Sequence, residues 1–180
     1  MTHTDTFDLA KAHLDDLRAE AAHQHLVRLA RASDRGAVRA FLSRLSPRTI
    51  QARYLSSAVP LDEERADLEL RRLFDNPAPE RTVVLAMFGP EVRGIGEFTV
   101  EGDDQAELGL LVEDAFQGRG IGKGLLRALQ RLAAQRGIEA FTGDVGHTNS
   151  RMLRLLRATG RKLRTQPDYG SLRFTLRLRS

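Results

Sequence analysis

The sequence "DAFQGRGIGKGLLRAL" (residues 114–129) carries the strongest structural signal in the chain. Within it, residues 118–124 place four glycines and two cations in seven positions, directly before an apolar helical repeat. Glycine weakens the start of a helix, so this many glycines indicate a function that needs bare backbone. A helix N-terminus presents unpaired N–H groups and partial positive charge, and this one therefore predicts an anion-binding site.

Two common phosphate-binding patterns do not fit this loop. A Walker A motif needs a glycine five residues before the Gly-Lys pair and Ser or Thr after it, but those positions hold Gln117 and Gly124. A dinucleotide-binding motif needs glycine at its first, third and sixth positions, and counting from Gly118 the sixth residue is Lys123. The predicted anion site is therefore of another kind.

The composition narrows the class of protein. The chain has 180 residues, a formal net charge of +4 and no cysteine. This length suits a single domain, and the lack of cysteine excludes disulfide frameworks, Cys-ligated metals and thiol nucleophiles. Neither a targeting signal nor a membrane span is recognisable, so we expect a cytoplasmic protein.

The charge is distributed unevenly along the chain. Residues 1–115 hold 14 Lys/Arg against 21 Asp/Glu, whereas residues 116–180 hold 14 against 3. Such asymmetry often marks a site for a polyanion, either nucleic acid or a phosphorylated cofactor.

Apolar periodicity predicts an α/β domain over residues 26–180, preceded by a helical extension over residues 1–25. Helices are predicted at residues 8–23, after an Asp34 cap, after a Ser46 cap, at 61–74, from the glycine loop to Gly137, and at 149–159. Strands are predicted at residues 26–30, 82–88, 92–100, 106–112, 138–145 and 171–178.

The motif "QGRGIG" (residues 117–122) resembles the Q/R-x-x-G-x-G/A motif of the GNAT superfamily of acyl-CoA-dependent N-acyltransferases. The strand "AELGLLV" before it and the helix "NSRMLRLLRATG" after it are similar to the elements that accompany this motif. The segment "LSPRTIQARYL" resembles part of bacterial protein-lysine acetyltransferases. The resemblance covers residues 26–178 and implies a mostly antiparallel mixed sheet, flanked by helices and splayed at the cofactor site.

The resemblance implies acetyl-CoA as the acyl donor, with no metal ion. In the family, main-chain amides of the glycine loop bind the CoA pyrophosphate, and nearby cations meet the 3′-phosphate. The loop residues this implies are Gln117, Gly118, Arg119, Gly120, Ile121, Gly122 and Lys123. The residues implied along the pantetheine arm are Leu110, Leu111 and Val112 through their main chain, and Asn149 through its side chain.

The resemblance also implies catalytic carboxylates. Glu107 heads the strand that would carry the thioester, where family members place a general base, although by residue type alone it would be a solvated strand residue. Asp144 on the neighbouring strand is the second candidate, ahead of Glu97 and His147. Many members have a tyrosine that protonates the CoA thiolate, but the matching position here is Leu156, which leaves water or another residue for that role.

We therefore expect an N-acetyltransferase that acts on a primary amine, either a small molecule or a protein lysine. A non-catalytic acyl-CoA-binding module is the first alternative, supported by Leu156. A nucleic-acid binder using the basic C-terminal half is the second, and it ranks lower because aromatic side chains are not interleaved with the arginines.

Overall fold

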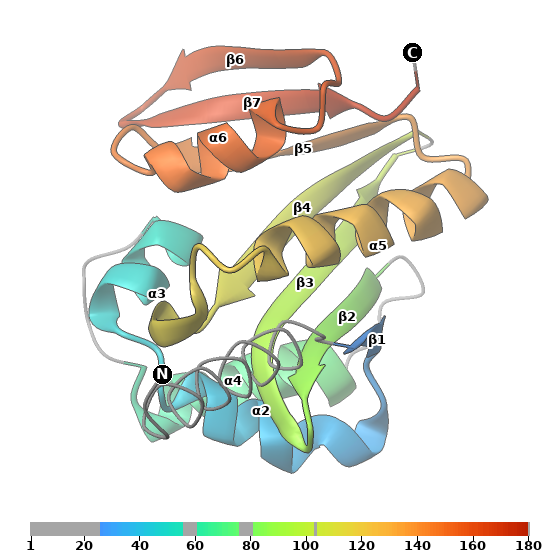
Figure 1. Ribbon diagram of the computed structural model, residues 1–180. Coiled ribbons are helices and arrows are strands. Elements are labelled where there is room, and N and C mark those ends of the chain that lie inside the picture. Colours follow the sequence, from blue (N-terminus) through green and yellow to red (C-terminus); the bar gives the residue numbers. More distant parts are fainter. Residues whose placement is uncertain (1–25, 56–60, 76–80, 103, 180) are drawn as a thin grey trace, which may run out of the picture.

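The computed structural model describes residues 26–55, 61–75, 81–102 and 104–179. The predicted helical extension over residues 1–25 lies outside this part of the chain. The described strands join one sheet with helices on both faces (Figure 1). A helix with the length and apolar character needed to cross a membrane does not occur among the described residues.

The bounds of the elements are as follows. The strands are β1 (Leu26–Leu29), β2 (Arg81–Phe88), β3 (Glu91–Glu101), β4 (Gln105–Val112), β5 (Ala140–Gly146), β6 (Leu163–Asp168) and β7 (Ser171–Arg177). The helices are α2 (Arg35–Leu42), α3 (Pro47–Tyr54), α4 (Glu63–Leu70), α5 (Ile121–Gln135) and α6 (Ser150–Arg157). Three short turns complete the set: η1 (Ala32–Asp34), η3 (Asp114–Phe116) and the π-helical η2 (Arg71–Asp75).

The sheet has seven strands in the order β1-β2-β3-β4-β5-β7-β6. All neighbouring strands are antiparallel except β4 and β5, which are parallel. This confirms the predicted mixed, mostly antiparallel sheet. Strand β6 was not predicted, because "LRTQPD" contains a single apolar residue before its proline and so lacks the alternation that marks a strand. Its pairing with β7 makes it a strand.

Two hydrophobic cores lie on opposite faces of the sheet (Figure 1). Helices α5 and α6 cover one face, and their buried side chains meet the aromatic rings of Phe98, Phe141 and Phe174. Helices α2, α3 and α4 cover the other face, against Leu85, Ile95 and Leu111 of the strands. The helices therefore cover the sheet on both sides, and each face has its own hydrophobic core.

Strands β4 and β5 pair over only a short distance. Gln105, Ala106 and Glu107 lie opposite Ala140, Phe141 and Thr142, and beyond them the two strands separate. Strand β4 stays paired with β3 to Val112, and β5 stays paired with β7 to Gly146. Residues 108–112 of β4 and 143–146 of β5 therefore line a gap within the sheet, which we call the β4–β5 opening. The predicted splay is thus present.

The helix caps differ in part from the prediction. Ser46 caps α3 as expected, because its hydroxyl accepts a hydrogen bond from Thr49 N at 3.3 Å. Asp34 stands at the N-cap position of α2 as predicted, but its side chain makes no capping hydrogen bond to an amide of the helix. Its carboxylate instead accepts two hydrogen bonds from the Arg28 guanidinium and one from Arg31 N, all at 2.7 Å. The guanidinium six residues before Asp34 and the amide of Arg31 thus occupy the carboxylate oxygens in place of an amide of α2.

The Arg28–Asp34 pair makes the protein sensitive to acid. The hydrogen bonds from Arg28 outweigh the cost of burial and hold the pKa of Asp34 below its ordinary value of 3.8. A carboxyl group with a lowered pKa in the folded state stabilises the fold above its ordinary pKa, and this contribution disappears as the pH falls through the folded-state pKa. Asp34→Asn is expected to lower the free energy of unfolding by about 1–3 kcal/mol at pH 7.

Urea unfolding at pH 7 and pH 3 measures this effect. The difference between wild type and Asp34→Asn should be smaller at pH 3, because Asp34 of the unfolded chain is then largely protonated and proton binding favours the unfolded state. Asp168→Asn, which changes an exposed carboxylate at the end of β6, is the control and should have little effect. A difference that is equally large at both pH values would contradict the prediction.

Candidate active site

One face of the sheet at the β4–β5 opening carries both predicted carboxylates. Glu107 lies opposite Thr142 in the parallel register, so both side chains point to the same face of the sheet. Asp144 is two residues beyond Thr142 and shares this face. Helix α3 covers the same face and reaches towards β5, because a Cβ on Gly146 would lie 3.6 Å from Leu55 Cδ2. The two predicted carboxylates therefore belong to the same side of the opening.

The two carboxylates differ in their partners. Glu107 is exposed and has no ion pair or hydrogen bond with any described residue. Asp144 is also exposed, but Arg173 of β7 lies 3.3 Å from its Oδ2. Glu107 is thus the carboxylate with its oxygens available to take a proton, whereas Asp144 already neutralises a guanidinium.

The weaker candidate Glu97 is engaged in a buried ion network. Its carboxylate accepts hydrogen bonds from Arg72 at 2.6 and 2.7 Å and from Arg53 at 2.8 Å. Burial alone would raise the pKa of Glu97, but Arg72 and Arg53 outweigh it and hold the pKa below its ordinary value. Such a carboxylate is a poor proton acceptor. The other weak candidate, His147, is exposed in the turn after β5.

The glycine loop leaves backbone donors unpaired at the start of α5. Gly118 and Gly120 have φ values of +80° and +82°, which L side chains rarely adopt, and a Cβ on either would meet no atom within 4 Å. The first hydrogen bond of α5 runs from Gly124 N to Gly120 O at 3.0 Å, and α5 has no side-chain cap. Within the described chain, the N–H groups of residues 121–123 thus remain available to an anion.

Cations and an amide surround this N-terminus. Arg119 lies over the ring of Phe116, at 5.2 Å from its centroid, and Lys123 is exposed in the first turn of α5. Asn149 caps α6 through Oδ1, which accepts from Met152 N at 3.1 Å. The side-chain nitrogen of Asn149 has no partner among the described residues. Leu110, Leu111 and Val112 supply the β4 main chain on the other side of the opening.

Helix α3 fixes the loop in a way that the sequence did not reveal. Asp114 accepts hydrogen bonds from Ser46 N at 3.0 Å, Ser46 Oγ at 2.6 Å and Thr49 Oγ1 at 2.9 Å. Gln117 donates to Thr49 Oγ1 at 3.1 Å and to Val112 O at 3.0 Å, and its Oε1 accepts from Arg151 of α6. The side chain of Gln117 therefore joins α3, β4 and α6. Ser46 was predicted as a helix cap. Its hydrogen bond to Asp114 was not predicted, because the two residues are 68 positions apart and local sequence does not connect them.

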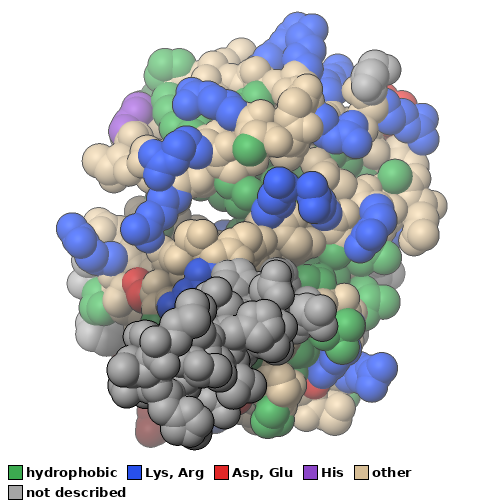
Figure 2. Space-filling view, in the orientation of Figure 1, with side chains coloured by type: hydrophobic (Ala, Val, Ile, Leu, Met, Phe, Trp, Pro, Cys, Tyr) green, Lys and Arg blue, Asp and Glu red, His purple; other side chains and the backbone are tan. Residues whose placement is uncertain are grey.

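The surface around the opening is basic. Figure 2 shows Lys and Arg side chains over α5 and α6, and a notch between the part that holds α6 and the part that holds the start of α5. Exposed cations at these helices include Lys123, Arg127, Arg131, Arg151, Arg154 and Arg157. An anionic ligand that enters at the notch would therefore meet a favourable field.

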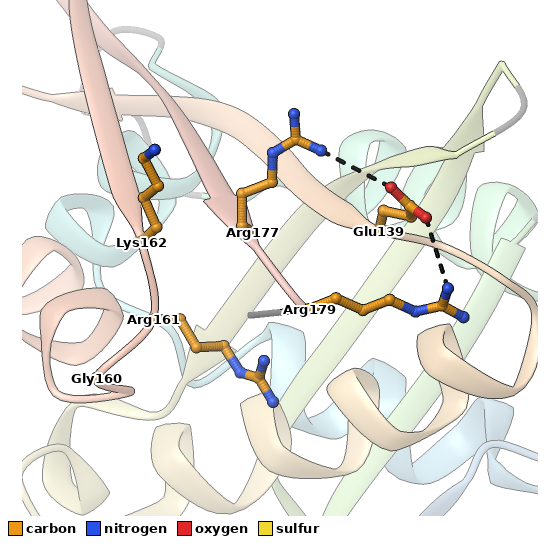
Figure 3. A pocket seen from close by; sticks show the side chains of 6 residues that line it. All are labelled: Glu139, Gly160, Arg161, Lys162, Arg177 and Arg179. Atoms are coloured by element: carbon orange, nitrogen blue, oxygen red, sulfur yellow. Dashed lines mark ion pairs between the residues drawn. The ribbon is translucent and has the colours of Figure 1, made fainter.

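A pocket of about 650 Å³ lies elsewhere, beyond the C-terminal end of α5 (Figure 3). It is lined by Glu139, Gly160, Arg161, Lys162, Arg177 and Arg179. Glu139 forms ion pairs with Arg177 at 3.9 Å and Arg179 at 3.5 Å, and these side chains are 41–61% exposed. Because the 15 residues of α5 span about 22 Å, this pocket is remote from the glycine loop.

The position of the missing tyrosine is inside the core. Leu156 is fully buried with Leu153 against α5 and the sheet. Of the two tyrosines, Tyr169 is fully exposed at the β6–β7 turn, and Tyr54 packs on the α2–α4 side of the sheet. Burial, with the nearby Glu69 carboxylate, raises the pKa of Tyr54 well above its ordinary value. Neither hydroxyl lies at the position that the family pattern gives to a thiolate acid.

Comparisons with known proteins agree with this geometry. A family model described as "Acetyltransferase (GNAT) family" matches residues 44–160, which is more than half of the chain. Comparison with curated protein sequences finds no match. Many solved structures share the fold.

Three solved structures illustrate the similarity. The GNAT domain of PAT from S. lividans has a TM-score of 0.74 and 22% identity, covering 85% of this chain and 90% of that chain. The protein yncA from Salmonella typhimurium, solved with acetyl-CoA, has a TM-score of 0.68 and 20% identity, covering 87% and 95%. A phosphinothricin acetyltransferase from Sinorhizobium meliloti, in complex with acetyl-CoA, has a TM-score of 0.63 and 19% identity, covering 85% and 87%. At these identities the likeness establishes the fold.

The burial of Leu156 gives a test of its role. Leu156→Tyr is expected to destabilise the protein by about 1–3 kcal/mol, because a larger polar side chain must enter a filled core. Leu156→Met keeps the volume and should cost less than about 1.5 kcal/mol. Thermal and urea unfolding measure both. A tyrosine variant as stable as wild type would show that this position opens to a cavity after all.

Proposed function

Because the chain belongs to the GNAT family of acetyltransferases and is an acyl-CoA-dependent N-acetyltransferase, we propose that it transfers acetyl from acetyl-CoA to a primary amine at the β4–β5 opening. The observation that carries this proposal is the parting of β4 and β5 after three paired residues, with the glycine loop at the open end. The acceptor is a small molecule or a protein lysine.

The cofactor assignment rests on complementary chemistry. The unpaired N–H groups at the start of α5 suit the pyrophosphate of CoA, and Arg119 and Lys123 supply mobile positive charge for its 3′-phosphate. The open side of β4 at residues 108–112 offers main-chain groups to the amides of the pantetheine arm. Similar structures that contain acetyl-CoA support this assignment.

The reaction needs a neutral amine. A primary amine with a pKa near 10.4 is only about 0.04% neutral at pH 7, a handicap of about 4.6 kcal/mol. Glu107 gives this proton an acceptor at the site, directly or through one water molecule, so that the bound amine can react in its neutral form. The nitrogen lone pair then attacks the thioester carbonyl carbon. Of the two predicted oxyanion donors, the N–H of Leu111 points to β3, so the N–H of Val112 donates to the developing oxyanion.

The tetrahedral intermediate then collapses. The C–S bond breaks, its electron pair leaves with the sulfur of CoA, and the nitrogen, which is positively charged after the attack, releases one proton to water to give the amide. A thiolate of pKa near 8.5 is an adequate leaving group, so water can return the proton. Leu156 packs in the core and has no proton to donate, which agrees with water as the proton donor.

The first test concerns the cofactor. Acetyl-CoA should raise the melting temperature of the wild-type protein, since it binds the native state only. Gly120→Asp should abolish this shift, because it places a side chain and a negative charge at a φ of +82° beside the expected phosphate. Gly137→Asp is the matched control, at a φ of +76° and at the opposite end of α5. A folded Gly120→Asp protein with wild-type affinity would remove the assignment.

The second test concerns the base. Release of free CoA thiol from acetyl-CoA is measured across a panel of amines, amino acids, peptides and proteins. Glu107→Gln should lower kcat about 100- to 10,000-fold with little change in acetyl-CoA affinity, and its residual rate should rise with pH. Asp144→Asn is compared directly, because it removes the other carboxylate of the same face. If Asp144→Asn shows this loss and Glu107→Gln does not, the base is Asp144.

A further inference from the structure

The guanidinium of Arg53 reaches β4 at Gly109, beside the β4–β5 opening. A Cβ on Gly109 would be 2.3 Å from Arg53 Nη2 and 2.7 Å from Cζ, so the guanidinium occupies the space of a side chain at this position. Gly109 is itself buried and sits opposite Glu97 in the β3–β4 register. The absence of a side chain at residue 109 is therefore what allows a cation to reach the middle of this strand.

A buried ion network holds the guanidinium in place. Glu97 Oε1 accepts from Arg53 Nη2 at 2.8 Å, and Arg72 joins Glu97 to Glu69. Within the described part of the chain Glu97 is the one acceptor of Arg53, which leaves most of its five N–H donors unused. The Arg53 side chain keeps 19% of its surface exposed. The Arg53 guanidinium is thus held in place by Glu97 and keeps N–H donors that could bind a ligand.

Glu107 is the nearest carboxylate along β4 on the same face. Gly109 follows it by two residues, which in a strand corresponds to about 7 Å. One wall of the opening therefore carries an unpaired carboxylate, suited to an ammonium group, next to a guanidinium with free donors. A zwitterion matches this order of charges, whereas a simple cationic amine would bring its charge towards Arg53.

We infer that Arg53 forms a carboxylate-binding subsite, so that the acceptor is a small amino acid whose amine and carboxylate are separated by a few carbon atoms. The inference rests on the proposed acetyl transfer and specifies its substrate class. The fork of the guanidinium pairs with a carboxylate through two N–H groups, and Glu107 then faces the amine. A carboxylate fits better than a dianionic phosphate, because Glu97 and Glu107 flank the guanidinium. The ε-amine of a protein lysine offers no such carboxylate.

The test compares matched acceptors on the wild-type protein. Free amino acids and their carboxamides are assayed by thiol release with acetyl-CoA, and kcat/KM is corrected for the neutral fraction of each amine. The acids are expected to exceed their amides by about 10- to 100-fold, the size of one lost charge-assisted hydrogen-bonding pair. Equal values, or faster transfer to a lysine-containing peptide, would overturn the inference while leaving acetyl transfer intact. Transfer to no amine at all would overturn the proposed function itself.

Two variants separate binding from a structural role. Arg53→Lys keeps the charge near Glu97 but lacks the fork, and Gly109→Ala keeps Arg53 but displaces the flexible end of its side chain. Both should lose the preference for the acid by raising KM for it about tenfold or more, with the rate on the amide nearly unchanged. Arg48→Lys, on the exposed side of α3, is the control and should keep the preference. Variants that slow acid and amide equally, or that melt earlier and keep the preference, would show that Arg53 is only structural.

Discussion

Strands β4 and β5 separate beyond Glu107 and Thr142, and much of the molecule follows from this. Each stays paired along its full length with its other neighbour, β3 for β4 and β7 for β5, so the gap lies between these two strands alone. Main-chain N–H and C=O groups inside a protein must find partners. A ligand with amide groups of its own can supply them, which is why a gap that would weaken an ordinary sheet can be the centre of an acetyl-CoA-dependent enzyme.

Helix α3 connects the separate parts of this centre. Its N-terminus binds Asp114 and Gln117 and so fixes the glycine loop. Its last turn carries Arg53 over β4. Leu55, the residue after the helix, lies next to Gly146 of β5. A helix of eight residues thus contacts both the glycine loop and the middle of β4. Under the proposed function, changes in α3 would therefore affect cofactor binding and acceptor binding without altering Glu107.

The sequence predicted what depends on local pattern. The glycine loop, the amphipathic α5 and the strand with Glu107 each have a periodicity or a spacing of their own, and the family resemblance ordered them. Strand β6 was missed because it owes its structure to β7 and not to its residues. Asp34 stands at the start of α2 as predicted, but its side chain pairs with Arg28, and nothing in the local pattern marks that partner. The contact of Arg53 with Gly109 joins positions 56 residues apart. It could not be predicted, because nothing in the local sequence of either residue indicates the other.

The outer strands have an effect that reaches beyond catalysis. β6 is exposed in all but its first residue and contains Pro167, which has no N–H to offer, while β1 at the other border has only four residues. Proline, charge and short length are the usual means by which sheets discourage further strands from docking. The main-chain groups that can bind a further partner are thus those of the β4–β5 opening and not those of the outer strands. The protein can keep a gap in its main chain ready for a ligand without inviting its own copies to polymerise through their borders.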